Sequence, residues 1–301
     1  MSFRREHVRK SLKWLMAGLL TVACIGPYGA VAVEESDAPT FKMNKIATCD
    51  SLAGFDKGGT EIVAYDWKGK RAYSTNSEVK AIDILDMSKL GEEEEIELLD
   101  RVGIDSLKIP GFVPDGITSV AIHPSGAYIA ASVSSSPLTD NGKVVFMDLN
   151  GTMIGWVTVG ALPDMLTFTP DGKQLLVANE GEPSADYTID PEGSVSIIDV
   201  TKMLSELTDA DVTTAGFGDV EIPDGVRVFA GLPEGNPSTT AEHMEPEFIS
   251  VSADSKFAYV ALQENNAIGV LNLTTLIFDE VRALGVKDHS LPGNGSAKWG
   301  L

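Results

Sequence analysis

A β-sheet unit recurs four times along this sequence, and no other feature limits the fold so strongly. The best-defined copy, Leu162 to Val200, has an apolar stretch, a turn at Pro170-Asp171-Gly172-Lys173, a second apolar stretch, a polar loop and a third apolar stretch. Proline presets φ for such a turn, and glycine accepts the positive φ that reverses the chain. A single unit of this kind cannot bury its apolar faces, so it needs neighbouring units to cover them.

The other three copies follow the same plan. Tight turns at corresponding places are Trp67-Lys68-Gly69-Lys70, His123-Pro124-Ser125-Gly126 and Ala253-Asp254-Ser255-Lys256, and the third stretches end on Asp83-Ile84, Asp148-Leu149 and Asn272-Leu273. Pro124 and Pro170 lie 46 residues apart, a spacing that suits four strands, and alternating apolar residues between turns predict antiparallel pairing. The sequence therefore predicts an all-β fold, a β-propeller with about four blades of the WD40 or YVTN type.

The repeats also predict the domain boundaries. Blades are expected over 60–112, 113–160, 161–244 and 245–290, after an N-terminal lead-in and edge strand over 33–59 in which Asn44 to Phe55 forms the strand. In the third blade, Val226 to Phe229 is expected as the outer strand, with a short helix near Thr201. Four-bladed propellers exist, but we expect these blades to be part of an incomplete ring of about seven.

Residues 1–32 have the pattern of a removed export signal. Trp14 to Gly26 is apolar, Ala30-Val31-Ala32 offers a cleavage site, and the basic start consists of Arg4, Arg5, Arg9, Lys10 and Lys13. The apolar run is shorter than the roughly 20 residues that span a bilayer as a helix, so no membrane span is expected after removal. Arg4-Arg5 leaves a twin-arginine route open, and Cys24 a lipoprotein. The predicted location is periplasmic, extracellular or on the cell surface.

The composition is strongly acidic. The 44 acidic residues outnumber the 23 Lys and Arg residues, which gives a formal net charge of −21. Such a surface repels nucleic acid and anionic lipid and attracts cations. Cys49 is the only cysteine outside the predicted leader, so the mature domain has no internal disulfide and depends on packing.

A cation site is predicted where the loops of several blades meet. Antiparallel strands alternate in direction, so the segments that enter the innermost strands lie on the same rim as the loops after the second strands. The residues proposed there as metal ligands are Asp164, Glu180, Glu182, Glu245, Glu247 and Glu264, and the wider rim includes Glu61, Asn76, Asp115, Asp140, Asn179, Gln263 and Asn265. Oxygen ligands of this kind suit Ca²⁺, which accepts six to eight of them. Unliganded, solvated acids are the alternative, since there is no EF-hand spacing.

The motifs of common enzymes are missing from the sequence. There is no GxSxG elbow, no phosphate-binding glycine-rich loop before a helix and no HExxH pair. His123 lies in a predicted turn, whereas His243 and His289 flank the fourth blade and are possible ligands or bases. The residues therefore identify no catalytic group, and a protein without enzymatic activity is the favoured interpretation.

Several segments together carry a family resemblance. They are Leu162-Pro163-Asp164, Asn179-Glu180-Gly181-Glu182-Pro183, Asp190-Pro191-Glu192-Gly193-Ser194-Val195, Gly225-Val226-Arg227-Val228-Phe229, Glu245-Pro246-Glu247, Leu262-Gln263-Glu264-Asn265-Asn266 and Lys287-Asp288-His289-Ser290-Leu291-Pro292-Gly293-Asn294-Gly295. As a set they resemble the choice-of-anchor I family of exported bacterial proteins, over roughly Ile46 to Gly295. The family continues beyond the last segment with further blades, whereas 296–301 diverge here, as in a truncated reading frame.

The resemblance implies two functions. The family is similar to mesenchyme-specific cell surface glycoproteins, which implies a binding scaffold whose partner is an extracellular protein, a glycan or a mineral surface. Some relatives are labelled as atypical alkaline phosphatases, which implies a metal-dependent phosphomonoesterase as the alternative. Ser184 is its nucleophile only by analogy, and analogy of fold is weak support for a function. We expect the scaffold, with calcium at the acidic rim.

Overall fold

The computed structural model describes residues 43–228, 239–288 and 290. The chain divides into two units, Met1–Asn44 and Lys45–Leu301, and all the strands belong to the second. The predicted signal at 1–32, the lead-in over 33–42, His289 and the divergent tail at 296–301 lie outside the described residues.

Four antiparallel sheets of four strands form the described part of the chain. The first two sheets consist of β1 (Val63–Asp66), β2 (Arg71–Asn76), β3 (Ala81–Asp86) and β4 (Glu97–Gly103), and of β5 (Pro114–Ile122), β6 (Ile129–Ser135), β7 (Asn141–Met147) and β8 (Met153–Ala161). The other two consist of β9 (Pro163–Phe168), β10 (Gln174–Asn179), β11 (Ser194–Asp199) and β12 (Val212–Gly216), and of β13 (Pro246–Val251), β14 (Phe257–Leu262), β15 (Ala267–Asn272) and β16 (Ile277–Ala283). Short 3-10 helices are η1 (Ile104–Ser106), η2 (Leu204–Glu206) and η3 (Asp209–Asp211).

The predicted turns join the first two strands of each sheet. Between β9 and β10, Thr169 N–H donates to the Gln174 carbonyl at 2.9 Å, and Asp171 Oδ1 accepts from Lys173 N–H at 3.1 Å. Gly172 has φ +70 there, a conformation that glycine adopts without steric cost. Side-chain acceptors and a reversal in the left-handed region thus close this turn in the way that its sequence predicts.

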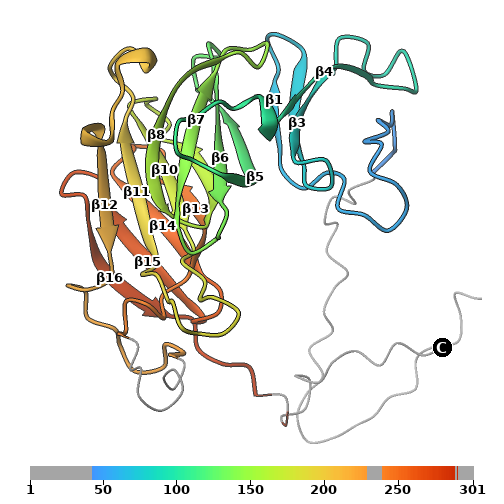
Figure 1. Cartoon of the computed structure of the whole chain (residues 1–301). Helices are drawn as coiled ribbons and strands as arrows, with labels where there is room; N and C mark the ends of the chain where they lie inside the picture. The colour runs from blue at the N-terminus through green and yellow to red at the C-terminus, as the bar shows by residue number, and fades with distance from the viewer. Residues whose placement is uncertain (1–42, 229–238, 289, 291–301) are drawn as a thin grey trace, which may run out of the picture. The chain divides into compact units, whose positions relative to one another are not determined.

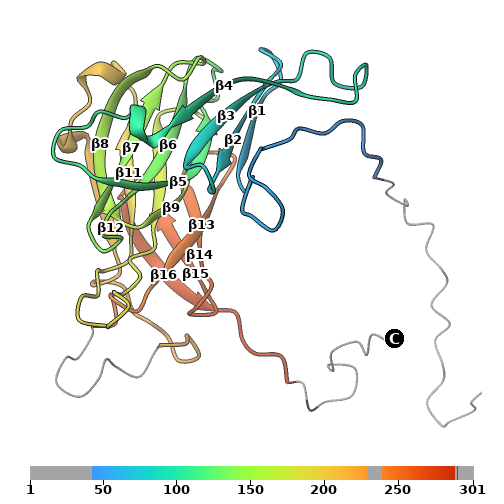
Figure 2. The same ribbon diagram turned by 45° about the vertical axis from the view of Figure 1, so that its right-hand side comes forward.

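Consecutive sheets lie side by side in chain order (Figures 1 and 2). The first strand of each sheet contacts the first strand of the next, β1 with β5, β5 with β9 and β9 with β13. A separate cluster of buried apolar residues fills each of the three spaces between sheets. This arrangement confirms the all-β propeller fold, with each sheet as one blade. Among the described residues no comparable contact joins β13 to β1, so these four blades do not close on themselves.

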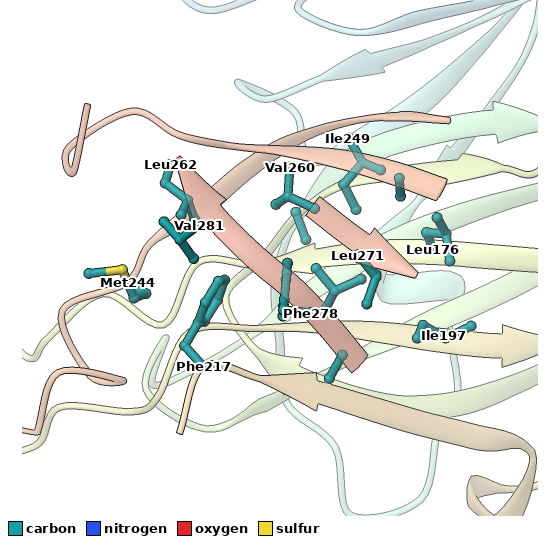
Figure 3. Packing of buried hydrophobic residues seen from close by; sticks show 14 of the residues in the cluster. Leu176, Ile197, Phe217, Met244, Ile249, Val260, Leu262, Leu271, Phe278 and Val281 are labelled. Carbon is teal, nitrogen blue, oxygen red and sulfur yellow. The ribbon is translucent and has the colours of Figure 1, made fainter. Parts of the chain in front are cut away.

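The space between the third and fourth blades shows how the strand pattern is used. Leu176 and Ile197 of the third blade face Ile249, Val260 and Leu271 of the fourth (Figure 3). At the outer end of the same cluster, the rings of Phe217 and Phe278 stack with their centroids 4.3 Å apart. Alternate residues of β10, β11, β14 and β15 therefore contribute to one buried layer, as the period of two requires.

Two strand predictions are wrong. The outer strand of the third blade is β12 rather than Val226–Phe229, because the extended run at Val212–Gly216 pairs along β11. Arg227 instead donates its N–H to the Asn265 carbonyl of the fourth blade, and Phe229 lies outside the described residues. The segment from Asn44 to Phe55 forms no strand but a single bridge between Thr48 and Glu95.

The missing edge strand has a local cause. Leu52 has φ +59, which interrupts an extended run, since strand residues need negative φ. The Ser51 carbonyl accepts hydrogen bonds from the Asn76 and Arg101 side chains at 3.0 and 2.9 Å. Residues 45–59 therefore contact the first blade through these side-chain hydrogen bonds and the single bridge at Thr48, without a continuous ladder.

The packing between blades predicts a contrast between two neighbours on β16. Phe278→Ala should lower the free energy of unfolding by about 3–5 kcal/mol, because it opens a cavity beside Phe217. Ile277→Ala, which removes an exposed side chain from the same strand, should cost under about 1 kcal/mol. Urea unfolding followed by circular dichroism measures both, and equal effects would contradict this packing.

Candidate metal centre

The innermost strands of three blades begin with the same dipeptide, a proline followed by an acid. These pairs are Pro114-Asp115, Pro163-Asp164 and Pro246-Glu247. Pro163 pairs with Asn179 at the end of β10, and Pro246 pairs with Leu262 at the end of β14. The antiparallel register thus places the residues that follow β10 and β14 beside the acids that begin β9 and β13.

Three glutamates converge at this point from two blades. Glu180 follows β10, Glu247 lies in β13, and Glu264 follows β14. All three are partly buried, and one carboxylate oxygen from each lies within 4.8 Å of the other two. Oxygen atoms this close suit a shared cation, because unscreened carboxylates repel one another.

Asn265 fixes the loop that carries Glu264. This fully buried amide donates from Nδ2 to the carbonyl oxygens of His243 and Arg227, at 2.5 and 3.0 Å, and its Oδ1 accepts from Glu245 N–H at 3.2 Å. The predicted rim residue Asn265 is therefore a structural amide that holds Glu264 and Glu245 in position. Gln263 contacts the site directly, since its Nε2 donates to Glu247 Oε1 at 3.1 Å.

Two glycines allow the loops to come so close. Gly181, with φ +72, lies against the backbone of Pro191 to Gly193, and a side chain there would be 2.9 Å from the Pro191 carbonyl oxygen. Gly193 lies against Met244, whose carbonyl oxygen any side chain at Gly193 would hit. The acidic loop of the third blade can therefore approach the segment that enters β13 only with glycine at these positions.

The pKa of Glu180 is raised most strongly, to about 8. Burial is the largest cause, and the neighbouring carboxylates of Glu182, Asp164, Glu247 and Glu245 add to it in that order. Both effects disfavour the charged form. Near neutral pH, Glu180 therefore holds a proton for much of the time unless a cation compensates the negative charge around it.

The neighbouring acids respond in the same way. Burial raises the pKa of Glu247 to about 7, helped by a hydrogen bond with the Glu264 carboxyl group and by its charge. Burial and the charge of Glu264 raise the pKa of Glu245 to about 7 as well. Asp164 also has a raised pKa, from burial first and then from Glu182 and Glu61. Two carboxyl groups can share a hydrogen bond only if one keeps its proton, which is why the contact with Glu264 raises the pKa of Glu247.

All six predicted ligands lie in this electrostatic cluster, but their role as metal ligands stays a prediction. Asp190 also belongs there, since its charge contributes to the raised pKa of Glu245. The sequence alone does not identify Asp190 as a member of the cluster, although Asp190–Val195 is one of the segments that carry the family resemblance. Four other predicted rim residues do not belong to the cluster. Asn76 and Asn179 are buried and hydrogen-bonded within their blades. Asp115 pairs with Lys80 at 3.3 Å, and Asp140 is exposed.

Two of the candidate catalytic residues, His123 and Ser184, make their contacts within turns. His123 lies in the β5–β6 turn, where Nε2 is 2.9 Å from the Gly172 carbonyl oxygen and the ring stacks on Tyr128. Ser184 donates its hydroxyl to Asp186 Oδ1 at 2.8 Å and accepts from the N–H of Ile189 at 3.0 Å. The Ser184 hydroxyl therefore closes a local turn, and nothing in this geometry supports it as a nucleophile.

The raised pKa values predict a pH-dependent stability for the metal-free protein. An unfolded glutamate titrates near its usual value of about 4.3, so the folded state binds more protons than the unfolded state up to pH 7–8. The free energy of unfolding should therefore fall as pH rises through this range. Thermal melts in EDTA from pH 5.5 to 9 test this dependence. The Tm of Glu180→Gln minus the Tm of the native protein should increase as pH rises.

Asp186 provides a control for this titration. Hydrogen bonds from Ser184 and Thr188 lower its pKa, so its contribution to stability is already constant above pH 5.5. Asp186→Asn should therefore shift Tm by the same amount at every pH tested. A Tm difference for Glu180→Gln that does not change with pH would contradict the buried acidic cluster.

Comparisons with solved structures find distant likenesses. A putative 6-phosphogluconolactonase from Bacteroides uniformis is 15% identical, with a TM-score of 0.47, and the match covers 81% of this chain and 60% of that one. A chain from a nidogen/laminin complex is 15% identical, with a TM-score of 0.44 and coverage of 76% and 65%. The β-propeller domain of Cps50 (Swd1) from Myceliophteria thermophila is 14% identical, with a TM-score of 0.44 and coverage of 77% and 58%.

The chain spans less than two thirds of the length of each of these structures, and the assignment of the fold rests on its own strand topology. Comparison with curated proteins finds no match. Among the described residues, no helix is long and apolar enough to cross a membrane. Residues 61–296 match the choice-of-anchor I domain, a range that includes all four blades. The chain belongs to the choice-of-anchor I family.

Proposed function

We propose that this protein is an exported propeller scaffold that binds a hard divalent cation, with Ca²⁺ as the expected ion, at the acidic cluster of its third and fourth blades. One observation carries the proposal. Oxygens of Glu180, Glu247 and Glu264 approach to within 4.8 Å of one another in a partly buried position. Membership in the choice-of-anchor I family supports export and a place at the cell surface.

The donor atoms favour calcium over softer metals. The cluster offers only carboxylate oxygens, whereas zinc and copper sites in proteins normally include histidine or cysteine. Ca²⁺ takes six to eight oxygens at 2.3–2.6 Å and tolerates irregular geometry. Three carboxylates can supply up to six oxygens, and Asp164, Glu182 and Glu245 would provide further negative charge around the ion.

The raised pKa values indicate what binding would do. Protons on Glu180, Glu245 and Glu247 relieve repulsion in the metal-free cluster. A divalent cation would replace these protons, so its affinity should rise as pH increases from 6 to 8. Oxygens of an extracellular protein, a glycan or a mineral surface would complete the coordination. Nucleic acid is a poor partner because the chain carries a formal net charge of −21.

Calorimetric titration with CaCl2 at pH 8 tests the proposal directly. Glu180→Gln and Glu247→Gln should each weaken binding by at least about tenfold, or ~1.4 kcal/mol, because each removes one ligand charge. The same two changes should stabilise the metal-free protein at this pH, because they relieve repulsion. Substitution of a metal ligand should thus weaken calcium binding and stabilise the metal-free protein. Substitution of a merely structural residue should not produce this pair of effects.

Asp115→Asn is the matched control for these variants. Asp115 begins an innermost strand after proline, as Asp164 does, but it pairs with Lys80 rather than with other acids. Its substitution should leave calcium affinity within about twofold. Absence of calcium binding by the native protein, or equal losses in the control and the two glutamate variants, would overturn the proposal.

A further inference from the structure

Three places in the sequence have the Asn-x-Ser/Thr pattern, without proline in the middle, to which N-linked oligosaccharides are attached in exported proteins. The three patterns begin at Asn150, Asn272 and Asn294, and Asn294 lies outside the described residues. The other two occur at the turns between the third and fourth strands of their blades. The pattern alone does not distinguish these two, so the surroundings of each asparagine decide which of them can carry a sugar.

Asn150 lies in the turn between β7 and β8. Asp148 shapes this turn, since its Oδ1 accepts from the N–H groups of Asn150 and Thr152 at 2.9 Å each. The carbonyl oxygen of Asp148 also accepts from Gly151 N–H at 3.0 Å. Asn150 and Thr152 are both exposed, so the two residues that define the pattern face solvent from a well-defined turn.

The first blade orients the side-chain amide of Asn150. Arg71 donates from Nη1 to Asn150 Oδ1 and to the Leu149 carbonyl oxygen, at 2.9 Å each. A guanidinium only donates hydrogen bonds, so the amide must turn its oxygen toward Arg71 and its nitrogen away. Neither Asn150 Nδ2 nor the Thr152 hydroxyl makes a hydrogen bond with any described residue. The nitrogen that would accept a sugar and the hydroxyl that the pattern requires are therefore both accessible.

Asn272, by contrast, already uses both ends of its amide within the fourth blade. Its Nδ2 donates to Asp279 Oδ2 at 3.1 Å, and its Oδ1 accepts from the N–H groups of Thr274 and Thr275 at 3.0 and 3.3 Å. The middle residue of this pattern, Leu273, is buried in the cluster between the third and fourth blades. A sugar on Asn272 Nδ2 would displace Asp279 from this contact, so the folded chain favours Asn150 as the acceptor.

The Asn150 turn lies at the end of its strands that is remote from the acidic cluster. At the other end of β7 and β8, Asn141 pairs with Ala161, and the Ala161 carbonyl oxygen accepts from Gly181 N–H, next to Glu180, at 3.3 Å. The seven residues of β7 separate the two ends by roughly 20 Å. A sugar at Asn150 would therefore leave the proposed cation site open.

We propose that Asn150 is a site of N-linked glycosylation in the exported protein. Asn150 Nδ2 forms a bond to the anomeric carbon of the first sugar, while the bond from that carbon to the pyrophosphate of a lipid-linked oligosaccharide breaks. The lipid pyrophosphate leaves with the electron pair, and Nδ2 loses one of its two protons. Oδ1 keeps its hydrogen bond to Arg71, so the turn keeps its conformation. Glycosylation requires the export that the proposed function includes, but it does not require the cation.

Export of the full chain from bacterial cells that carry an oligosaccharyltransferase and a lipid-linked oligosaccharide is the primary test, read by mass spectrometry. The native protein should gain the mass of one oligosaccharide, on the peptide that contains Asn150. Asn150→Gln should abolish this gain. Thr152→Ala should also abolish it although Asn150 stays in place, whereas Thr152→Ser should retain it because serine keeps the hydroxyl. Thr152 is exposed, so circular dichroism should show unchanged folds.

Thr274→Ala is the matched control, since it removes the exposed hydroxyl of the second pattern and should leave the gain in mass unchanged. The purified full chain is also incubated with the same transferase and oligosaccharide. Transfer to Asn150 there, without modification in cells, would support the site and contradict export. Absence of the oligosaccharide from both preparations, or its persistence in Thr152→Ala, would overturn the site. Calcium affinity should be equal with and without the oligosaccharide, so failure of the native chain to bind calcium would contradict only the proposed cation site.

Discussion

Burial of sheet faces between neighbouring blades is the constraint on which the rest of this structure depends. Each four-stranded sheet has apolar residues on both faces, and water would contact both of them if the sheet stood alone. Side-by-side packing buries the apolar faces in the three spaces between blades. In the space between the third and fourth blades, Leu176, Val260 and Phe278 are among the residues removed from solvent. The ends of the series need other solutions. Residues 45–59 cover part of the first blade, whereas the fourth blade keeps exposed aromatic side chains.

The same packing determines where the acids lie. Because every blade begins its innermost strand at the same rim, Asp164 and Glu247 occupy equivalent places, and the loops after β10 and β14 bring Glu180 and Glu264 beside them. No local motif assembles these residues, which lie up to 100 positions apart in the chain. Repulsion among these carboxylates destabilises the fold, and packing elsewhere in the chain compensates for it, as is common for functional sites. A cation would reduce that cost, which connects the fold to the proposed function.

The blades and their tight turns were predictable from the sequence, because turn preferences and the alternation of apolar and polar residues in strands are local properties. Turns such as Pro170–Lys173 and the strands beside them follow from residue preferences within a few positions, and the order of antiparallel strands places Glu180 and Glu247 on one rim. The outer strand β12 was not predictable in this way, since Val212–Gly216 is short and its pairing depends on β11. The break at Leu52 and the burial that raises the pKa of Glu180 depend on tertiary contacts, which periodicity does not reveal. The contribution of Asp190 was missed for the same reason.

We propose that radial packing of the blades brings carboxylates from distant parts of the chain around one cation. A crystal structure of the protein grown with calcium tests this most directly, with anomalous scattering to identify the ion. We expect one calcium ion with oxygens of Glu180, Glu247 and Glu264 at 2.3–2.6 Å. An ion bound elsewhere, or these three carboxylates separated and individually solvated, would contradict it.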